Sequence, residues 1–262
     1  MTPLTLAMII AATTLGGVVS VLVAAALSLT LLAGIVRQLV SLSAGLLLAT
    51  AILHVLPEAF ESGANPHTLT WALLGGLIAF FLLEKLEILR HSHHHEGDGH
   101  DHHHGHDREE AGPGGTLILV GDSIHNFADG VLIAAAFMVD HRLGWLTTLA
   151  IAAHEIPQEI GDFIILLNAG YSRQRALLFN AISGLAAVAG GVAGYFVLAE
   201  SAGLLPYVLM FAAASFIYVA LADLVPDLHR HSRNGGAWKM QFVLMMVGVA
   251  IVAVLTAQLH AH

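Results

Sequence analysis

Apolar segments long enough to cross a bilayer follow one another along most of the chain, and they restrict what it can fold into. A spanning helix needs about 20 mainly apolar residues, and such runs are too long for the strands of a soluble protein. Only 11% of the 262 residues are charged, against about 25% in soluble domains. We therefore predict an all-α integral membrane protein with eight transmembrane helices. Their expected ranges are 4–34, 38–60, 68–90, 115–139, 143–168, 174–200, 204–228 and 237–259.

The basic residues indicate which side of the membrane each loop faces. The loops after the even-numbered segments contain only Arg142. The loops after the odd-numbered segments contain the other basic loop residues, which are Arg37, Arg90, Arg108, Arg173, Arg175, Arg230, Arg233 and Lys239. Because cytoplasmic loops are enriched in Lys and Arg, we expect both termini to lie on the outer side of the cell membrane. No basic stretch precedes the first segment, so we interpret it as a membrane helix and not as a removable signal peptide.

One polar linker, residues 91–114, divides this single membrane domain into residues 1–90, with three helices, and residues 115–262, with five. Its His-rich, Gly-rich and acidic composition is typical of disorder, and the charge distribution places it in the cytoplasm. We expect its histidines to capture metal weakly, because a disordered segment has no fixed ligand geometry. They include His93, His94, His95, His102, His103 and His104.

Acidic side chains interrupt the fourth and fifth apolar segments. An acid at the centre of a bilayer costs roughly 2.5–3.5 kcal/mol on insertion scales, so five of them would cost on the order of 15 kcal/mol if ionised and unpartnered. The five are Asp122, Asp129, Glu155, Glu159 and Asp162. A bound divalent cation would offset this cost, and the absence of cysteine leaves nitrogen and oxygen donors to bind it.

The fourth segment places its polar residues at helical spacing. His125 and Asp129 are four residues apart and therefore lie on one helix face, with Asp122 one turn before them. Asn126 lies about 100° around the helix and adds an amide oxygen. We expect Asp122, at the edge of this set, to have a structural or relay role.

The fifth segment, which contains the string "HEIPQE", carries two further pairs at the same spacing. His154 pairs with Gln158, Glu155 pairs with Glu159, and Asp162 lies at the edge of the set. Imidazole combined with carboxylate suits zinc and other first-row divalent metals. Two such helices face to face would enclose one or two cations.

Pro157 lies within this set and removes one helical hydrogen bond, which frees the carbonyl of Ala153. A membrane helix tolerates such a break where it packs against protein or lines a polar cavity. We therefore expect the fifth segment to line a permeation path.

The second and seventh segments end in similar strings, "HVLPEAF" and "ADLVPDL". They offer His54 and Glu58 in one case, and Asp223 and Asp227 in the other. One interpretation is a relay that guides metal between the centre and opposite faces of the membrane. The alternative is that these residues cap their helices or stabilise interfaces. The shared proline beside an acid is also consistent with an inverted repeat.

The strings "HNFAD" and "HEIPQEIGDF" resemble those of the ZIP (Zrt/Irt-like) divalent-metal transporters, in particular the branch whose fifth helix carries His-Glu-x-Pro-His-Glu. The resemblance extends to the eight expected helices, the His-rich linker, and the ends of the second and seventh segments. It implies a ZIP-type bundle with the fourth and fifth helices at its centre. It also implies zinc as the substrate, with Fe²⁺, Mn²⁺ and Cd²⁺ as further candidates, flow into the cytoplasm, and homodimers in the lipid bilayer. The ligand positions that it implies are His125, Asn126, Asp129, His154, Glu155, Gln158 and Glu159.

Two departures from that family affect the expected site. Gln158 stands where the branch has histidine, and an amide is a weaker ligand. Other branches bring a glutamate from the sixth helix to a second metal position, where this chain has Ala186 and Ala187. The first metal position is therefore better supported than the second.

Two other functions fit parts of the pattern. A cation-diffusion exporter also pairs His with Asp and carries a His-rich loop, but it resembles a six-helix bundle with a soluble C-terminal domain. An intramembrane zinc protease would use an HExxH motif, in which the second histidine is here Gln158. We therefore expect a transporter of divalent metal ions and not an enzyme, with no organic cofactor and no nucleic-acid partner.

Overall fold

The computed structural model describes residues 2–28, 33–92, 111–168, 170–226, 228 and 237–260, and it contains no strand in these ranges. The all-α class predicted from the sequence is therefore confirmed. The helical elements are α1 (Pro3–Thr13), η1 (Thr14–Val19), α2 (Ser20–Ser28), α3 (Ala33–Thr50), η2 (Ala51–Val55), α4 (Leu56–Glu61), α5 (Pro66–Ser92), α6 (Ala111–Val139), α7 (His141–Asn168), α8 (Arg173–Glu200), η3 (Ala202–Leu204), α9 (Leu205–Tyr218), η4 (Val219–Leu224) and α11 (Ala237–His260).

Six helical stretches of the described chain are long and apolar enough to cross a membrane. The long helices α6 and α7 are not among them, although they have 29 and 28 residues. Both contain the acids and histidines noted above, which lower their mean hydropathy. The membrane class is thus supported by the most apolar helices, and the count of eight spans stays a prediction.

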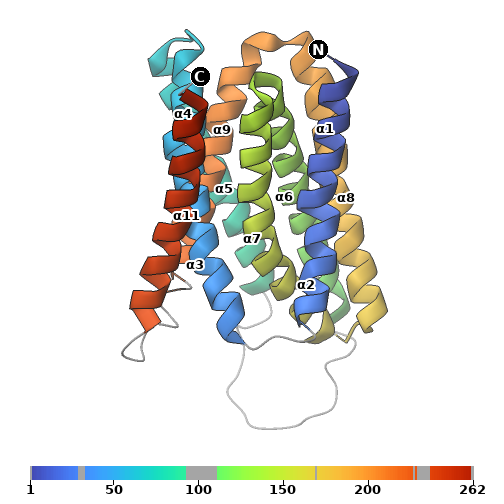
Figure 1. The fold of residues 1–262 in the computed structure, drawn as a ribbon. Helices are drawn as coiled ribbons and strands as arrows, with labels where there is room; N and C mark the ends of the chain where they lie inside the picture. Colours follow the sequence, from blue (N-terminus) through green and yellow to red (C-terminus); the bar gives the residue numbers. More distant parts are fainter. Residues whose placement is uncertain are drawn as a thin grey trace.

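The helices form two groups that lie side by side (Figure 1). One group contains α1, η1, α2, α6, α7 and α8, and the other contains α3, η2, α4, α5, α9, η4 and α11. The groups meet mainly where α3 packs along α7. The N-terminal end of α1 and the C-terminal end of α11 lie at the same end of the molecule, as an even number of crossings requires (Figure 1).

Glycines allow the backbones of α6 and α8 to approach closely. A Cβ atom on Gly130 would lie 2.7 Å from the backbone nitrogen of Gly191 and closer still to the carbonyl oxygen of Ala187. Gly190 faces the Phe127 carbonyl in the same way. Small residues serve helix packing in membranes because lipid supplies no hydrophobic force between helices. The α6–α8 pair is consequently a tight unit that positions the polar face of α6.

Within the described ranges, three helices widen into π-type turns. The first, η1, contains Gly16 and Gly17. The other two, η2 and η4, come directly before Pro57 and Pro226, at the ends of the two similar strings. A proline clashes with the preceding turn, and a wider turn relieves that clash.

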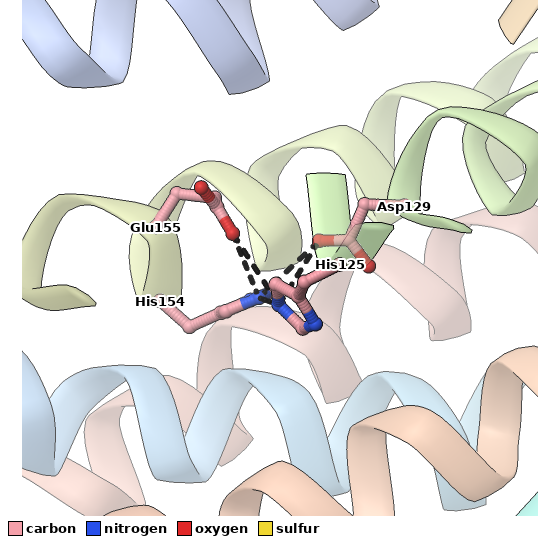
Figure 2. Close-up of side chains that lie close together, drawn as sticks. All are labelled: His125, Asp129, His154 and Glu155. Atoms are coloured by element: carbon pink, nitrogen blue, oxygen red, sulfur yellow. Dashed lines mark hydrogen bonds and ion pairs between the residues drawn. The ribbon is translucent and has the colours of Figure 1, made fainter. Parts of the chain in front are cut away.

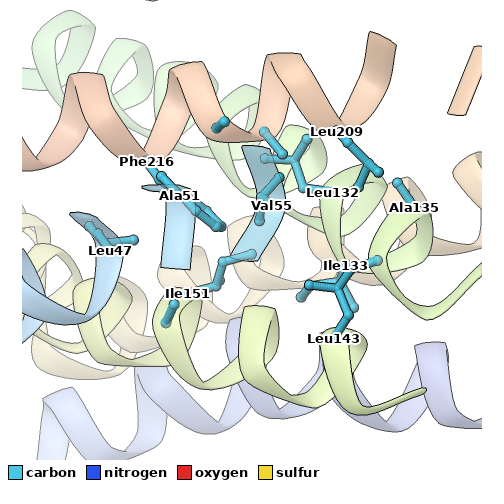
Figure 3. Close-up of a cluster of buried hydrophobic side chains, with 14 of the residues drawn as sticks. Leu47, Ala51, Val55, Leu132, Ile133, Ala135, Leu143, Ile151, Leu209 and Phe216 are labelled. Atoms are coloured by element: carbon cyan, nitrogen blue, oxygen red, sulfur yellow. The ribbon is translucent and has the colours of Figure 1, made fainter. Parts of the chain in front are cut away.

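The largest apolar core lies between α3, α6, α7 and α9 (Figure 3). Leu47, Ile133, Leu143, Ile151 and Phe216 are all 0–1% exposed there. Ile133 and Leu143 belong to the halves of α6 and α7 that face the end with both termini. On that side of the bundle the interior is therefore apolar and closely packed.

Two differences from the predicted boundaries exceed two residues and change how the chain is divided. α3 begins at Ala33, whereas the first segment was predicted to continue to residue 34. The predicted linker 91–114 is helical at both ends, because α5 extends to Ser92 and α6 begins at Ala111. The linker histidines 93–95 and 102–104 lie outside the described residues.

Candidate metal centre

The polar residues of α6 and α7 meet halfway along both helices. His125 is near the middle of the 29-residue α6, and His154 is near the middle of the 28-residue α7. At 1.5 Å per residue, each lies about 20 Å from either end of its helix. A site at this level would fall near the midplane of a bilayer whose hydrocarbon core is about 30 Å thick.

Four side chains converge at this level, two from each helix (Figure 2). Nε2 of His154 lies 3.3 Å from Asp129 Oδ2 and 3.4 Å from Glu155 Oε1. Nε2 of His125 lies 3.5 Å from the same Glu155 oxygen and 3.8 Å from Asp129 Oδ2. The two Nε2 atoms are 3.4 Å apart. We call these residues the four-ligand group.

Four of these five distances are close to the edges of a tetrahedron of zinc ligands. Bond lengths of about 2.0–2.1 Å to nitrogen and oxygen give ligand-to-ligand edges of about 3.3–3.4 Å. Five of the six edges in the four-ligand group measure 3.3–3.8 Å. The remaining edge, between the two carboxylates, is no longer than 4.8 Å. A small contraction would therefore complete a tetrahedral site.

The carboxylates of the group are removed from water, and within the group they face the two imidazoles at 3.3–3.8 Å. Asp129 and Glu155 are 1% and 0% exposed, and neither oxygen of either side chain has a hydrogen-bond partner. Burying an unpaired carboxylate costs several kcal/mol, and paired or metal-bound charges avoid this cost. The burial of these acids is what a cation-binding site requires.

A backbone carbonyl orients one of the imidazoles. Nδ1 of His154 lies 3.3 Å from the carbonyl oxygen of Ala150, which can only accept a hydrogen bond. A proton on Nδ1 satisfies this carbonyl and leaves Nε2 as the atom that would bind a metal ion. A second contact of this kind commonly fixes the tautomer of a metal-binding histidine.

A second group of acids adjoins the first. One carboxylate oxygen from each of Asp122, Glu155 and Glu159 lies within 4.8 Å of the others, and Glu155 belongs to both groups. Glu159 is 0% exposed, and its carboxylate has no hydrogen-bond partner. Asp122, which the sequence analysis placed at the edge of the set, is 5% exposed and lies inside this second group. The reason is that α6 and α7 pack so that Asp122 faces the Glu155–Glu159 side of α7.

Asp122 also collects three hydrogen bonds from side chains. The amide nitrogens of Asn126 and Gln158 donate to its Oδ1 over 3.0 and 3.3 Å, and the Ser183 hydroxyl donates to its Oδ2. Both amides expected as ligands thus face Asp122 through their nitrogens. Ser183, on α8, was missed by the sequence analysis. Its position in the small-residue stretch "AISGLAAVAGG" carried no functional signal.

His54, Glu58 and Asp162, among the remaining candidates, belong to neither group. His54 is buried in η2, Glu58 is half-buried in α4, and Asp162 is half-buried in α7. Asp223 belongs to η4, and Asp227 lies outside the described residues.

Pro157 does not end α7, which is continuous from His141 to Asn168. The carbonyl oxygen of Ala153, which the sequence analysis expected Pro157 to free, accepts a hydrogen bond from the Ser43 hydroxyl of α3. The interruption is therefore stabilised by protein packing, as expected for a proline inside a membrane helix.

Comparison with known proteins identifies one family of metal transporters. The family model described as ZIP Zinc transporter matches residues 2–112 and 84–256. Zinc transporter ZIP13 of Danio rerio is 30% identical over 254 residues, which cover 78% of this chain and 71% of that protein. Zinc transporter ZIP4 of Mus musculus is 43% identical over 51% of this chain and 20% of its own length. Zinc transporter foi of Drosophila melanogaster is 36% identical over 52% of this chain. The chain spans only 19% of the length of the Drosophila protein.

Proposed function

The chain belongs to the ZIP zinc transporter family, and we propose that it carries Zn²⁺ across a cell membrane through the four-ligand group of His125, Asp129, His154 and Glu155. The observation that carries this proposal is the close spacing of four ligand atoms, three of them on buried residues, halfway along two long helices. Mixed imidazole and carboxylate ligands favour zinc, and they also bind Fe²⁺, Mn²⁺ and Cd²⁺.

In this mechanism the four side chains replace the hydration shell of the ion near the midplane. The bound ion offsets the cost of burying the carboxylates of Asp129 and Glu155. These carboxylates in turn offset the cost of removing water from the ion. Glu159 and Asp122 offer a second, adjacent position that shares Glu155 with the first. The amides of Asn126 and Gln158 donate hydrogen bonds to Asp122 of the second position. The first position has four ligands of its own and does not need these amides.

We propose that transport runs towards the side on which α5 ends and α6 begins, and that this side faces the cytoplasm. Between the site and the end with the termini, Leu132, Ile133 and Leu143 form a closely packed apolar layer. In the other direction, Gln158 and Asp162 are polar and half-buried. This asymmetry supports a state that is closed towards the outside and more hydrated towards the cytoplasm. Alternating access would then require the two helix groups to move relative to each other.

The peripheral candidates fit around this path as proposals. His54 and Glu58 would serve the outer mouth, and Asp223 and Asp227 would serve the inner one. The linker histidines would capture the released metal. We further propose that the exposed apolar faces of the bundle contact lipid and, in a homodimer, a second copy of the chain.

The test is zinc uptake by proteoliposomes that contain the purified chain. His125→Ala and Glu155→Ala are expected to abolish uptake, because each removes one of four ligands. Matched controls are His67→Ala and Glu200→Ala, which alter exposed residues at helix ends and should leave uptake unchanged. Undiminished uptake in both site variants would refute the proposed site.

The protease alternative has no support from the arrangement around position 158. A second zinc-binding histidine is required there, and Gln158 instead donates a hydrogen bond to Asp122. The family model and the relatives that match this chain carry the name ZIP zinc transporter, which disfavours both the protease and the cation-diffusion exporter.

A further inference from the structure

One carbonyl of α7 lacks its helical partner directly before the metal centre. In an α-helix the carbonyl of Ala153 would accept from the backbone nitrogen of residue 157, but Pro157 has no N–H. A carbonyl left unpaired inside a membrane protein is costly, so a donor from elsewhere is needed.

The donor is Ser43, which comes from the other helix group and is 110 residues away in the chain. Its side chain is 1% exposed, and its hydroxyl points from α3 to the Ala153 carbonyl. The same hydroxyl lies 2.8 Å from the Leu39 carbonyl one turn back in α3. Because a hydroxyl has one proton, the two carbonyls share it. The Ser43 hydroxyl therefore keeps a partner even when α3 separates from α7.

The surroundings of this hydrogen bond are apolar. Leu46, Leu146 and Val252 are 0–5% exposed and form a small core with Ala153 packed against it. Water is a poor substitute for Ser43 in such surroundings. The turn that follows Ala153 carries His154 and Glu155, which supply two of the four ligand atoms. The hydrogen bond thus holds the backbone from which half of the site projects.

We propose that Ser43 is a positioning residue for the metal centre, because its hydroxyl satisfies the carbonyl that Pro157 frees and so fixes the ligand-bearing turn of α7. This inference rests on the proposed function and assigns a residue outside both metal-binding helices. Contacts that orient metal ligands typically change metal affinity by 10–100-fold when they are removed. A backbone contact acts less directly than a partner of a ligand itself, so the lower end of that range is expected.

The experiment measures zinc binding to the full chain in detergent by calorimetry with a competing chelator. Ser43→Ala should raise the Kd for zinc by about 10-fold, and Ser43→Thr, which keeps the hydroxyl, should restore most of the affinity. The matched control is Thr148→Val. Thr148 is also buried, and its hydroxyl donates to the Gly144 carbonyl of its own helix. The Thr148→Val substitution should change the Kd for zinc by less than about 2-fold.

A double-mutant cycle with Pro157→Ala separates positioning from general packing. Alanine restores an N–H at position 157, so Ala153 regains its helical donor. Removing the Ser43 hydroxyl should then have little further effect on the Kd. The double variant also remains informative if Ser43→Ala alone does not fold. An equal loss in both backgrounds, or a Kd within 2-fold of the unaltered chain, would overturn the role of Ser43. Absence of zinc binding in the unaltered chain would instead refute the proposed function.

Discussion

Gly130→Ala tests whether the close packing of α6 on α8 is needed for the metal centre. Gly130 follows Asp129 in the chain, and its added Cβ would lie 2.7 Å from the backbone nitrogen of Gly191. Ordinary van der Waals contact for such an atom begins at 3.4 Å. The two backbones must therefore separate by at least 0.7 Å, the difference between these distances. No side chain can move aside to relieve the clash, because the opposing atoms belong to the backbone.

A displacement of this size exceeds what a metal site tolerates, since ligand distances need to hold within about 0.2 Å. If α6 moves, Asp129 and His125 shift away from the ligands of α7. If α8 moves, Ser183 leaves Asp122. Overpacking of this kind costs about 1–3 kcal/mol of folding stability, and we expect the upper half of that range. The expected result is a lower unfolding temperature and zinc binding weakened by at least 10-fold.

The assay combines calorimetry with thermal unfolding of the chain in detergent. Gly75→Ala in α5 is the matched control, because nothing lies within 4 Å of the Cβ that it would add. That change should leave zinc binding intact and stabilise the helix by up to about 1 kcal/mol. The reasoning would be refuted if Gly130→Ala had the same zinc affinity and the same unfolding temperature as the unaltered chain.

Three further changes test other parts of the site. Ser183→Ala removes a donor to Asp122, a hydrogen bond to a charged group worth about 1.5–3 kcal/mol, and should weaken zinc binding at the second position about 10-fold in calorimetry. Ser172→Ala at the N-cap of α8 is its control, because it should alter stability but not affinity. Lowering the pH should weaken zinc binding, since the ligands must lose protons to bind metal; proton release measured in buffers of different ionisation enthalpy checks the sign. Deletion of residues 93–106 should leave most uptake intact in proteoliposomes, and complete loss would show that the linker belongs to the path.

The chemistry of the site could be predicted from the sequence because helical spacing is local. Two residues four apart lie on the same face of any α-helix, which holds for His125 and Asp129 and for Glu155 and Glu159. Pro157 likewise determines by its own covalent structure that the Ala153 carbonyl needs another donor. The apolar composition determined the all-α membrane class in the same way, since it depends on residue types alone.

The tertiary structure decided which faces meet and what surrounds them. The crossing of α6 and α7 makes Glu155 a member of two groups and brings Asp122 inside the second one. Ser43 and Ser183 acquire their roles only because α3 and α8 pack at these positions, far away in the chain. Their hydroxyls have no distinguishing pattern in the sequence. The reason is physical: spacing along one helix follows from its 3.6-residue period, whereas a contact between helices depends on the packing of every residue at their interface.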